Sequence, residues 1–399
     1  MKWEKKTLDE LGTVGRGRSK HRPRNDPKLF GGKYPFIQTA DVKNANFYII
    51  NFSSTYNEEG LAQSKLWPAG TLCITIAANI ADTGILAIPA CFPDSIMGFV
   101  ANEEIADTRF VKYCFDVLQK ECKQISQGTA QDNLSWEKLS TIKFLVPPLQ
   151  TQKRIASILS AYDDLIENNQ KHIKLVEEAA QRLYKEWFVD LRFPGHEGVK
   201  IVDGVPEGWK IKKIEELADT MSGGTPTRSH EEYYSSGKIL WLKTKELNDG
   251  FIFDTEEKIT EAGLKNSSAK LFEKGCIILA MYGATIGRLG ISSVTMCCNQ
   301  ACCVLKIKEI FLFEYVYLWL VNNREMLISR GRGSAQSNLS QELIKQIEVR
   351  IPSDGVLIKF SNVVDKLLKN KEILEKQISS LREARDRLLP KLMSGEIEV

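Results

Sequence analysis

Residues 12–19 have a composition that could hold a nucleotide phosphate. They read GTVGRGRS, one residue away from the phosphate-binding loop pattern, in which backbone N–H groups surround the phosphates and a lysine reaches them. Arg18 stands where the pattern requires that lysine, and the SKHRPRNDP that follows cannot form the helix that such a loop needs. The stretch therefore does not predict nucleotide binding.

Acidic residues give one formal match to a nuclease pattern. Asp94, Glu121 and Lys123 fit the loose acid, acid and lysine order of metal-dependent nucleases. That order is so permissive that a chain of 399 residues is expected to contain it by chance, and the second half of the chain has no counterpart. A base methyltransferase would need Asp or Asn before Pro-Pro and an aromatic residue, but the only Pro-Pro lies in VPPL at residues 146–149. We expect no catalytic centre in this chain.

Cysteine and histidine are the remaining candidates for metal chemistry. The sequence MCCNQACCVLKI contains Cys297, Cys298, Cys302 and Cys303. Thiolates are good zinc ligands, but adjacent residues of a strand point to opposite faces, so we expect small buried side chains rather than a zinc site. The histidines, none in a metal-ligand spacing, are His21, His172, His196 and His230.

Composition describes an ordinary globular chain, since 43% of its residues are hydrophobic and 26% are charged. Its length predicts more than one domain. Nine scattered cysteines suit reduced thiols better than disulfides, and the N-terminal MKWEKKTLDE has no apolar signal-peptide core behind it. The apolar residues 311–321 fall short of the ~18 to 20 needed to span a bilayer. We expect a cytoplasmic protein with no membrane partner.

A basic loop is the strongest local charge feature. The formal net charge of +3 is too small to indicate nucleic-acid binding alone, but residues 16–33 hold seven basic residues against one acid, Asp26. The basic residues are Arg16, Arg18, Lys20, Arg22, Arg24, Lys28 and Lys33. Such an exposed loop could contact phosphates, or it could simply be a solvated surface without a partner.

The chain contains an internal repeat. Residues 128–147 (GTAQDNLSWEKLSTIKFLVP) and 333–352 (GSAQSNLSQELIKQIEVRIP) share nine identities in twenty positions at an offset of 205. Nearly the same offset relates Trp3 to Trp209 and Gly70 to Gly275. Each half therefore predicts one globular domain of about 150 residues.

After each globular part the apolar period becomes helical. The spacing of four and three residues is that of a coiled-coil seam. The first seam is Ile155, Leu159, Tyr162, Ile166, Asn169, Ile173, Val176, Ala180, Leu183 and Trp187. The second is Phe360, Val364, Leu367, Lys371, Leu374, Ile378, Leu381, Arg385, Leu388 and Leu392, with polar breaks at Lys371 and Arg385. Asn169 could fix the register of the helices or be a tolerated buried amide.

These elements predict an α+β fold in which two tandem mixed α/β domains are separated by two long helices. Because the order is domain, helix, domain, helix, the helices can pair only if they are antiparallel, and the domains are then related by a pseudo-two-fold axis. A helix over residues 155–187 would be roughly 50 Å long at ~1.5 Å per residue and would act as a spacer. The predicted boundaries are residues 1–149 for the first domain, 150–190 for the first helix, 191–205 for a linker, 206–352 for the second domain and 353–399 for the second helix and tail.

Several motifs, duplicated and in this order, closely resemble the specificity subunits of type I restriction-modification enzymes. They are SGGTP at 222–226, YGATIG at 282–287, the two Gly-Ser/Thr-Ala-Gln-x-Asn-Leu-Ser segments and PPLQTQ at 147–152. The resemblance covers nearly the whole chain. It departs at residues 351–355 (IPSDG), where the Pro-Pro-Leu and Gln signature is missing, and at 79–84 (NIADTG), which replaces the Tyr-Gly turn. The second departure indicates that the two domains read different bases.

The resemblance implies a non-catalytic subunit with two target-recognition domains that read a bipartite, asymmetric site in double-stranded DNA. It implies two methyltransferase subunits as partners, and restriction subunits in the full complex. S-adenosylmethionine, and ATP and Mg for restriction, are expected on those partner subunits and not on this chain. A non-DNA scaffold that presents two protein-binding domains on a helical spacer is the alternative.

Candidate DNA contacts follow from the basic loop and from polar residues in the repeated turns. In the first domain they are Arg16, Arg18, Lys20, Arg22, Arg24, Gln38, Thr39 and Asn79. In the second they are Thr225, Thr227, Arg228, Lys243, Tyr282, Thr285 and Arg288. The similarity of the two Gly-Ser/Thr-Ala-Gln-x-Asn-Leu-Ser segments favours a shared backbone turn over base contacts, although either is open.

Overall fold

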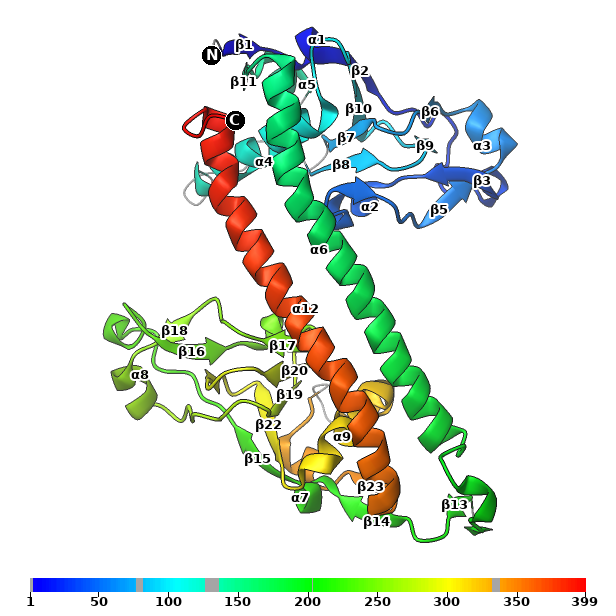
Figure 1. Ribbon diagram of the computed structural model, residues 1–399, viewed down its shortest axis with the longest axis vertical. Coiled ribbons are helices and arrows are strands. Elements are labelled where there is room, and N and C mark those ends of the chain that lie inside the picture. The colour runs from blue at the N-terminus through cyan, green and yellow to red at the C-terminus, as the bar shows by residue number, and fades with distance from the viewer. Residues whose placement is uncertain (1–2, 77–81, 126–135, 203, 332–337) are drawn as a thin grey trace. The chain divides into compact units, whose positions relative to one another are not determined.

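A computed structural model of the chain describes residues 3–76, 82–125, 136–202, 204–331 and 338–399 (Figure 1). The chain divides into two compact units. Unit 1 comprises Met1–Asn168 and Ile378–Val399, and unit 2 comprises Asn169–Gln377. Among the described residues, no helix combines the length and apolar character needed to cross a membrane.

Unit 1 is built on a five-stranded sheet. Its strands, in spatial order, are β2 (Gly12–Arg16), β10 (Ile96–Ala101), β7 (Leu72–Thr75), β8 (Thr83–Leu86) and β4 (Tyr48–Ile49). Neighbours are antiparallel except for β4 and β8, which are parallel. A second sheet has the order β5 (Ser54–Tyr56), β3 (Phe30–Phe36), β9 (Ala90–Cys91) and β6 (Leu66–Trp67). A separate pair joins β1 (Glu4–Lys6) to β11 (Phe144–Val146).

The helices of unit 1 cover these sheets. They are α1 (Leu8–Leu11), α2 (Thr39–Asn44), α3 (Glu58–Ala62), α4 (Thr108–Ile125) and α5 (Trp136–Thr141), with a short 3-10 turn at Pro27–Leu29. Strand β7 is buried on both faces because its residues alternate between two cores. Leu72 and Ile74 pack with Phe110 of α4, whereas Cys73 packs with Val42 of α2.

Unit 2 repeats this plan. Its main sheet has the order β15 (Ala218–Ser222), β22 (Cys302–Ile307), β19 (Ile277–Ala280), β20 (Leu289–Ser292) and β17 (Gly250–Ile252), again with one parallel pair at the β17 edge. A three-stranded sheet has the order β18 (Lys258–Ile259), β16 (Ile239–Leu242) and β21 (Cys297–Cys298). Two-stranded pairs join β14 (Lys210–Lys213) to β23 (Glu348–Ile351) and β12 (Ile201–Val202) to β13 (Val205–Pro206). The prediction of two tandem mixed α/β domains is confirmed.

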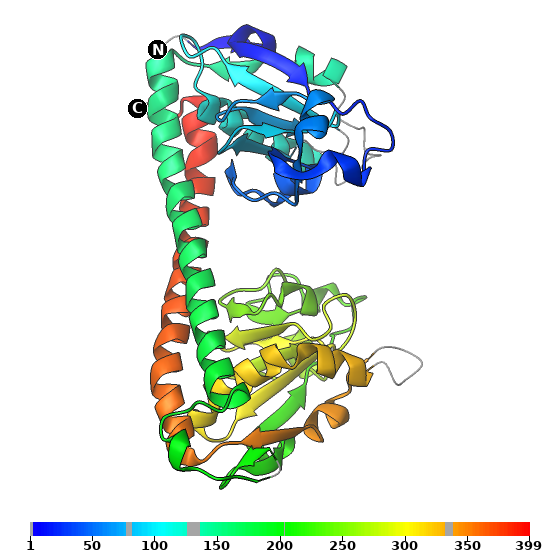
Figure 2. The ribbon, with the colours of Figure 1, turned by 90° about the vertical axis from the view of Figure 1, so that its right-hand side faces the viewer.

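Helices cover the sheet of unit 2 as well, and α9 crosses one face of it (Figure 2). The helices are α7 (Ile214–Leu217), α8 (Glu261–Lys265), α9 (Phe313–Asn322), α10 (Arg324–Gly331) and α11 (Gln341–Lys345). Short 3-10 turns occupy His196–Gly198, Glu231–Tyr233, Thr244–Glu246 and Ile310–Leu312. The four cysteines of β21 and β22 are free and buried, as predicted for small core side chains.

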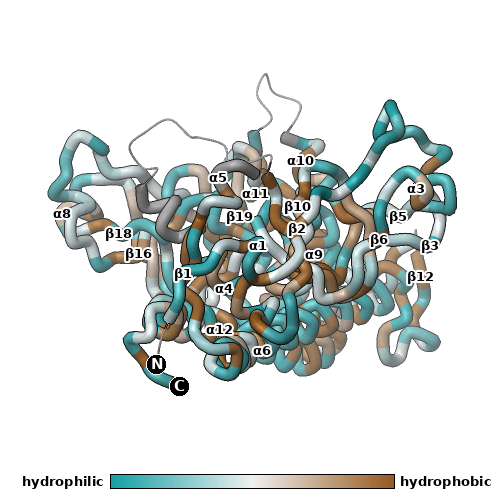
Figure 3. The backbone as a smooth tube through the Cα atoms, turned by 90° about the horizontal axis from the view of Figure 1, so that it is seen from above, coloured by the Kyte–Doolittle hydropathy of each residue, from teal (hydrophilic) through white to brown (hydrophobic). Residues whose placement is uncertain are grey.

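Two long helices contribute to both units. Helix α6 (Leu149–Tyr184) continues into a π-helical turn at Lys185–Val189, and α12 runs from Asp354 to Ser394. Hydrophobic and hydrophilic residues alternate around both helices (Figure 3). In unit 2, Glu177 contacts Lys371 and Trp187 contacts Phe360, so residue numbers rise along α6 as they fall along α12. The two helices are therefore antiparallel there, as predicted.

The predicted seam residues lie in the helix interfaces of their own units. Ile155, Leu159, Ile166, Asn169, Leu374 and Ile378 are buried, and Ile173, Leu183, Trp187, Leu367, Leu381 and Leu388 are half-buried. Asn169 Nδ2 donates to Gln377 Oε1 at 3.2 Å. The polar breaks are ion pairs: in unit 1 Arg385 pairs with buried Asp163, and in unit 2 Lys371 is only 2% exposed and pairs with Glu177. Each polar residue that seemed to interrupt the seam in the sequence is thus paired with a carboxylate of the facing helix in its own unit.

Candidate nucleic-acid interface

The first part of the basic loop presents a row of three cations. Arg16, Arg18 and Lys20 are exposed, whereas Gly17 and Ser19 between them are buried. The alternation is that of extended chain, and it is held by Arg18 N–H, which donates to the Phe92 carbonyl at 2.9 Å. A Cβ on Gly17 would come within 2.2 Å of the Pro93 carbonyl oxygen, so only glycine fits. Within the described part of the chain, these three cations form no ion pair.

The second part of the loop uses its cations internally. Arg24 forms a bidentate pair with Asp94, at 2.7 and 2.8 Å. Arg22 donates through one guanidinium nitrogen to the carbonyls of Ser19 and His21. Asp94, which fitted the nuclease pattern in the sequence, is therefore the counter-charge of an arginine. Arg22 and Arg24 are less available to phosphate than the row before them.

Gln38 and Thr39 begin α2 on the surface of unit 1. The Gln38 backbone N–H donates to Asp41 Oδ2 at 2.7 Å, and its side-chain amide donates weakly to two serine hydroxyls, Ser53 at 3.3 Å and Ser54 at 3.4 Å. Ile37 N–H donates to the Cys91 carbonyl, next to the Phe92 carbonyl that binds the basic loop. Gln38 and the cation row thus flank one short segment. Asn79 lies outside the described residues.

In unit 2, Arg228 and Lys243 share one carboxylate. Glu257 accepts from Arg228 at 2.7 Å and also pairs with Lys243. The Arg228 guanidinium lies over the rings of Tyr234, at 4.4 Å, and Trp241, at 5.0 Å. Arg228, Lys243 and Glu257 are called the Glu257 cluster below. A guanidinium held by a carboxylate and two rings is oriented before any ligand arrives.

Thr225 and Thr227 lie beside this cluster in sequence, in the segment that follows β15. Both are exposed. The Thr225 hydroxyl donates to the side-chain oxygen of Gln300, and the Thr227 carbonyl accepts from His230 N–H at 3.2 Å. Both threonines lie on the surface, but the Thr225 hydroxyl already uses its proton on Gln300 and could still only accept a hydrogen bond.

Tyr282, Thr285 and Arg288 belong to the turn between β19 and β20. Gly283 and Gly287 have φ angles of 83° and 79°, a left-handed conformation that favours glycine and lets this chain reverse. Tyr282 is half-buried against the core, which raises the pKa of its phenol through desolvation. The Thr285 carbonyl accepts a hydrogen bond from Arg288 N–H. The Arg288 side chain is 52% exposed and pairs with Asp249 at 3.0 Å. Arg288 therefore gives this turn an accessible positive charge.

In unit 2, the segment that contains Thr225 and the turn that contains Tyr282 both contact residues 299–301. Thr225 binds Gln300, and Met281 N–H, just before Tyr282, donates to the Ala301 carbonyl at 2.8 Å. This segment follows β21, which pairs in parallel with β16 as β9 pairs with β3 in unit 1. The candidate residues of the two units therefore gather at equivalent places.

The repeated polar segments are only partly visible, because residues 126–135 and 332–337 lie outside the described residues. At the end of the second copy, buried Leu339 donates its N–H to the Met281 carbonyl at 2.8 Å. Ser340 caps α11 by accepting from Leu343 N–H at 3.1 Å. These contacts give this part of the repeat a role in shaping the backbone beside Tyr282.

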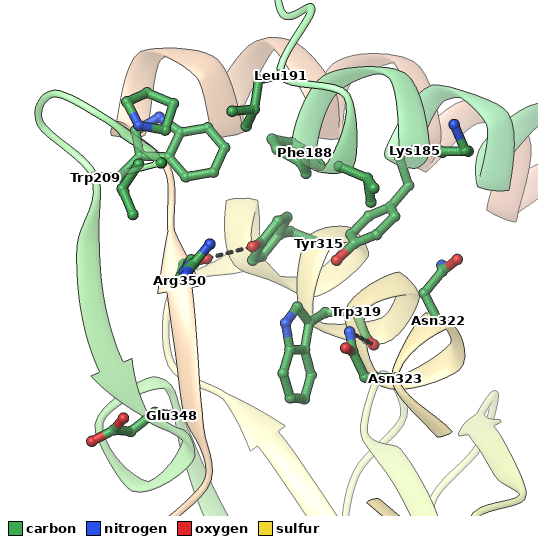
Figure 4. A pocket seen from close by; sticks show the side chains of 15 residues that line it. Lys185, Phe188, Leu191, Trp209, Tyr315, Trp319, Asn322, Asn323, Glu348 and Arg350 are labelled. Atoms are coloured by element: carbon green, nitrogen blue, oxygen red, sulfur yellow. Dashed lines mark hydrogen bonds between the residues drawn. The ribbon is translucent and has the colours of Figure 1, made fainter. Parts of the chain in front are cut away.

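A cavity of about 590 Å³ lies elsewhere in unit 2 (Figure 4). Aromatic side chains line it, namely Tyr184, Phe188, Trp209, Tyr315 and Trp319. Tyr315 donates its hydroxyl to the Arg350 carbonyl, which fixes α9 against β23. None of the candidate DNA contacts lines this cavity, so it does not belong to the candidate interface.

The sequence did not reveal the acidic partners of the candidate cations. Glu257 and Asp249 orient Arg228, Lys243 and Arg288. Neither acid stands in a motif, and a single acidic residue carries no signal in a sequence. Lys371 did leave a signal, since it interrupts an apolar seam. A buried lysine requires nearby carboxylates, so that interruption could have pointed to a charge network.

Comparison with known proteins adds to this geometry. The sequence matches the type I restriction modification DNA specificity domain twice, over residues 1–178 and 206–382. It is 26% identical to the type I restriction enzyme MjaIX specificity subunit of Methanocaldococcus jannaschii, over 100% of this chain and 94% of that protein. It is 24% identical to the HindI specificity subunit of Haemophilus influenzae, over 91% and 94%. The solved S subunit of a type I system from M. genitalium shares the fold, with a TM-score of 0.63 and 18% identity over 98% of this chain and 96% of that one.

Proposed function

Since the chain belongs to the family of type I restriction-modification specificity subunits, which are non-catalytic, we propose that it reads a bipartite, asymmetric site in duplex DNA. Each domain reads one half of the site. The observation that carries the proposal is the row Arg16, Arg18 and Lys20, which is exposed and has no counter-charge among the described residues. Such a row is suited to a polyanion.

The row suits a DNA backbone because of its spacing. Alternate residues of extended chain lie about 6.6 Å apart at ~3.3 Å per residue, so neighbouring cations can each reach a different phosphate. Phosphate contacts place a protein on DNA without reading its sequence. Sequence reading then falls to polar groups that flank the row, of which Gln38 in the first domain can pair with an adenine edge.

The second domain presents a different surface. Its cations Arg228 and Lys243 are held by Glu257, and Arg288 is oriented by Asp249. Arg288 can pair with the O6 and N7 acceptors of guanine. Two domains with the same backbone plan and different polar groups are expected to read different base sequences, which makes the site asymmetric.

The remaining chemistry is assigned to partner subunits. We propose that the chain directs two methyltransferase subunits, and restriction subunits in the full complex, to the site that it reads. S-adenosylmethionine, ATP and Mg would be bound by those partners. Within the described residues of this chain, Asp94 is engaged by Arg24 and the cysteines are buried, which supports this division of labour.

A salt titration of the full chain with a labelled duplex tests DNA binding. The logarithm of the binding constant falls with the logarithm of salt by about 0.9 for each phosphate that is neutralised. Replacing Arg16, Arg18 and Lys20 with alanine should flatten that slope by about 2 to 3. Replacing Arg22 and Arg24 should flatten it less, because both already have partners.

The matched control removes the same charge elsewhere. Lys359, Lys366 and Lys376 are exposed on α12, and their triple alanine variant should leave the slope near that of the unchanged protein. Binding that does not weaken with salt, or equal slopes in both triple variants, would contradict the assigned DNA face. A protein-binding scaffold would give that result.

A further inference from the structure

The loop before β17 is held in an unusual conformation. Asp249 has a φ of 67°, in the left-handed region that residues other than glycine rarely adopt. Its carbonyl accepts from Lys371 Nζ at 2.6 Å and from the Tyr317 hydroxyl at 2.8 Å. Its carboxylate accepts from Leu289 N–H at 3.0 Å. The surrounding structure therefore fixes this residue from several directions.

Helix α12 binds the backbone of the loop, and α6 supports one of the α12 residues that do so. Lys371 of α12 lies between Glu177 of α6, at 2.6 Å, and Glu375, at 3.8 Å. Glu375 also accepts from Phe251 N–H at 2.6 Å. The intervening Gly250 allows this approach, since a Cβ there would lie 2.7 Å from Glu375 Oε1. Helix α12 is thus connected directly to the loop, and α6 is connected to it through the Glu177–Lys371 ion pair.

The buried lysine remains charged. Desolvation alone would lower the pKa of Lys371, but Tyr317 and the carboxylates of Glu177 and Glu375 outweigh it and raise the pKa. A charged ammonium that is 2% exposed binds its partners strongly because water does not compete. Removing it would leave two carboxylates and a backbone carbonyl without their shared donor.

The side chain of Asp249 contacts Arg288, one of the candidate DNA-binding residues. Its two carboxylate oxygens accept from Arg324 at 2.5 Å and from Arg288 at 3.0 Å. One edge of the Arg288 guanidinium is therefore fixed while half of the side chain stays exposed. At the repeat offset, Ile166 replaces Lys371, so the first domain cannot form the same network.

We propose that Lys371 and Asp249 are positioning residues for base reading by the second domain. Lys371 fixes the loop to the helix pair, and Asp249 fixes Arg288 in the orientation that meets a base edge. The inference rests on the proposed DNA-reading function and adds the residues that control one half of the site. A bidentate contact tolerates little displacement, so an arginine that loses its support should discriminate poorly.

The experiment measures base preference position by position. The full chain selects from a pool of duplexes with a randomised segment, and sequencing gives the preference of each variant. Arg288→Ala should lower discrimination at one position of one half-site by about 5- to 150-fold. Lys371→Met and Asp249→Asn should lower discrimination at the same position. Lys371→Met combined with Arg288→Ala should be no worse than Arg288→Ala alone.

Controls separate positioning from general damage. Lys369→Met changes an exposed lysine of the same helix, 69% exposed, and should leave all preferences unchanged. Asn adopts the left-handed region more readily than most residues and keeps the carbonyl that Lys371 binds, so Asp249→Asn decides the question if Lys371→Met does not fold.

Each outcome is decisive. Unchanged preference at the Arg288 position in Lys371→Met and Asp249→Asn would overturn this inference while leaving the proposed function intact. Equal losses in both half-sites would also overturn it, because they would indicate a structural role. An unaltered protein that selects no sequence would overturn the proposed function and this inference with it.

Discussion

Replacing Glu257 with glutamine tests how the second domain controls its own positive charge. In the Glu257 cluster two cations share one carboxylate, so its net charge is +1 and becomes +2 in the variant. One more uncompensated cation adds at most one phosphate contact, which steepens the salt dependence by about 0.9. Between 50 and 200 mM salt the variant should therefore lose about 3.5-fold more affinity for a scrambled duplex than the unchanged protein does.

The Arg228 ion pair is worth no more than about 1 kcal/mol because Arg228 is 54% exposed, but Lys243 is 17% exposed, so the loss of its carboxylate should also lower the stability of unit 2. Anisotropy titrations against salt measure the slope, and thermal melting checks the fold. Glu256→Gln is the matched control. The Glu256 carboxylate is next to Glu257 in the sequence and pairs with exposed Lys245, so its removal adds the same unit of positive charge. Equal steepening in both variants, or none in Glu257→Gln, would refute the idea that this carboxylate restrains DNA contact.

Three further predictions concern the helices and their buried charges. Asp163→Ala should destabilise unit 1 by about 3 to 5 kcal/mol in denaturant unfolding, because the buried Tyr113 hydroxyl loses its acceptor and partly buried Arg385 keeps the more exposed Asp386 as its ion-pair partner; an effect below 1 kcal/mol would contradict this. Burial raises the pKa of Glu314, although the Ser361 hydroxyl donates to its carboxylate. The folded state therefore holds the Glu314 proton more tightly than the unfolded state does, and the free energy of unfolding should fall as pH rises through the folded pKa. Glu314→Gln should flatten the dependence of melting temperature on pH, and an unaltered profile would show that another group titrates. One heptad added to both helices near Asn169 and Leu374 lengthens each helix by ~10 Å and should lengthen the preferred gap of the DNA site by about three base pairs, at ~3.4 Å per base pair. Binding to a series of sites with graded gaps measures this. A retained preference for the original gap would show that the helices do not set the spacing.

The sequence predicted what depends on local pattern and repetition. The offset of 205 predicted two domains of one plan, and the five-stranded sheets of both units do share their strand order and their parallel edge. The four-three spacing predicted the paired helices, because burying a seam requires only periodicity.

Partners distant in sequence could not be predicted. The basic loop looked uniform, yet Arg24 is neutralised by Asp94, seventy positions away, and Arg16 is not. Lys371 and Arg385 looked like weaknesses of the seam, because periodicity does not show which carboxylate lies opposite. The fold follows from pattern, whereas the availability of each charge depends on tertiary contacts.

The composition of unit 1 has a consequence for synthesis. Its core includes Leu389 and Leu392 together with Ile155 and Leu159, so residues 378–399 complete a domain that began at the N-terminus. On the ribosome, unit 2 has all of its residues once Gln377 has emerged, while unit 1 must wait for α12 to be finished. The domain that is translated first is thus the last to close, and a premature stop in the final two turns of α12 would damage the N-terminal domain and spare the one made after it.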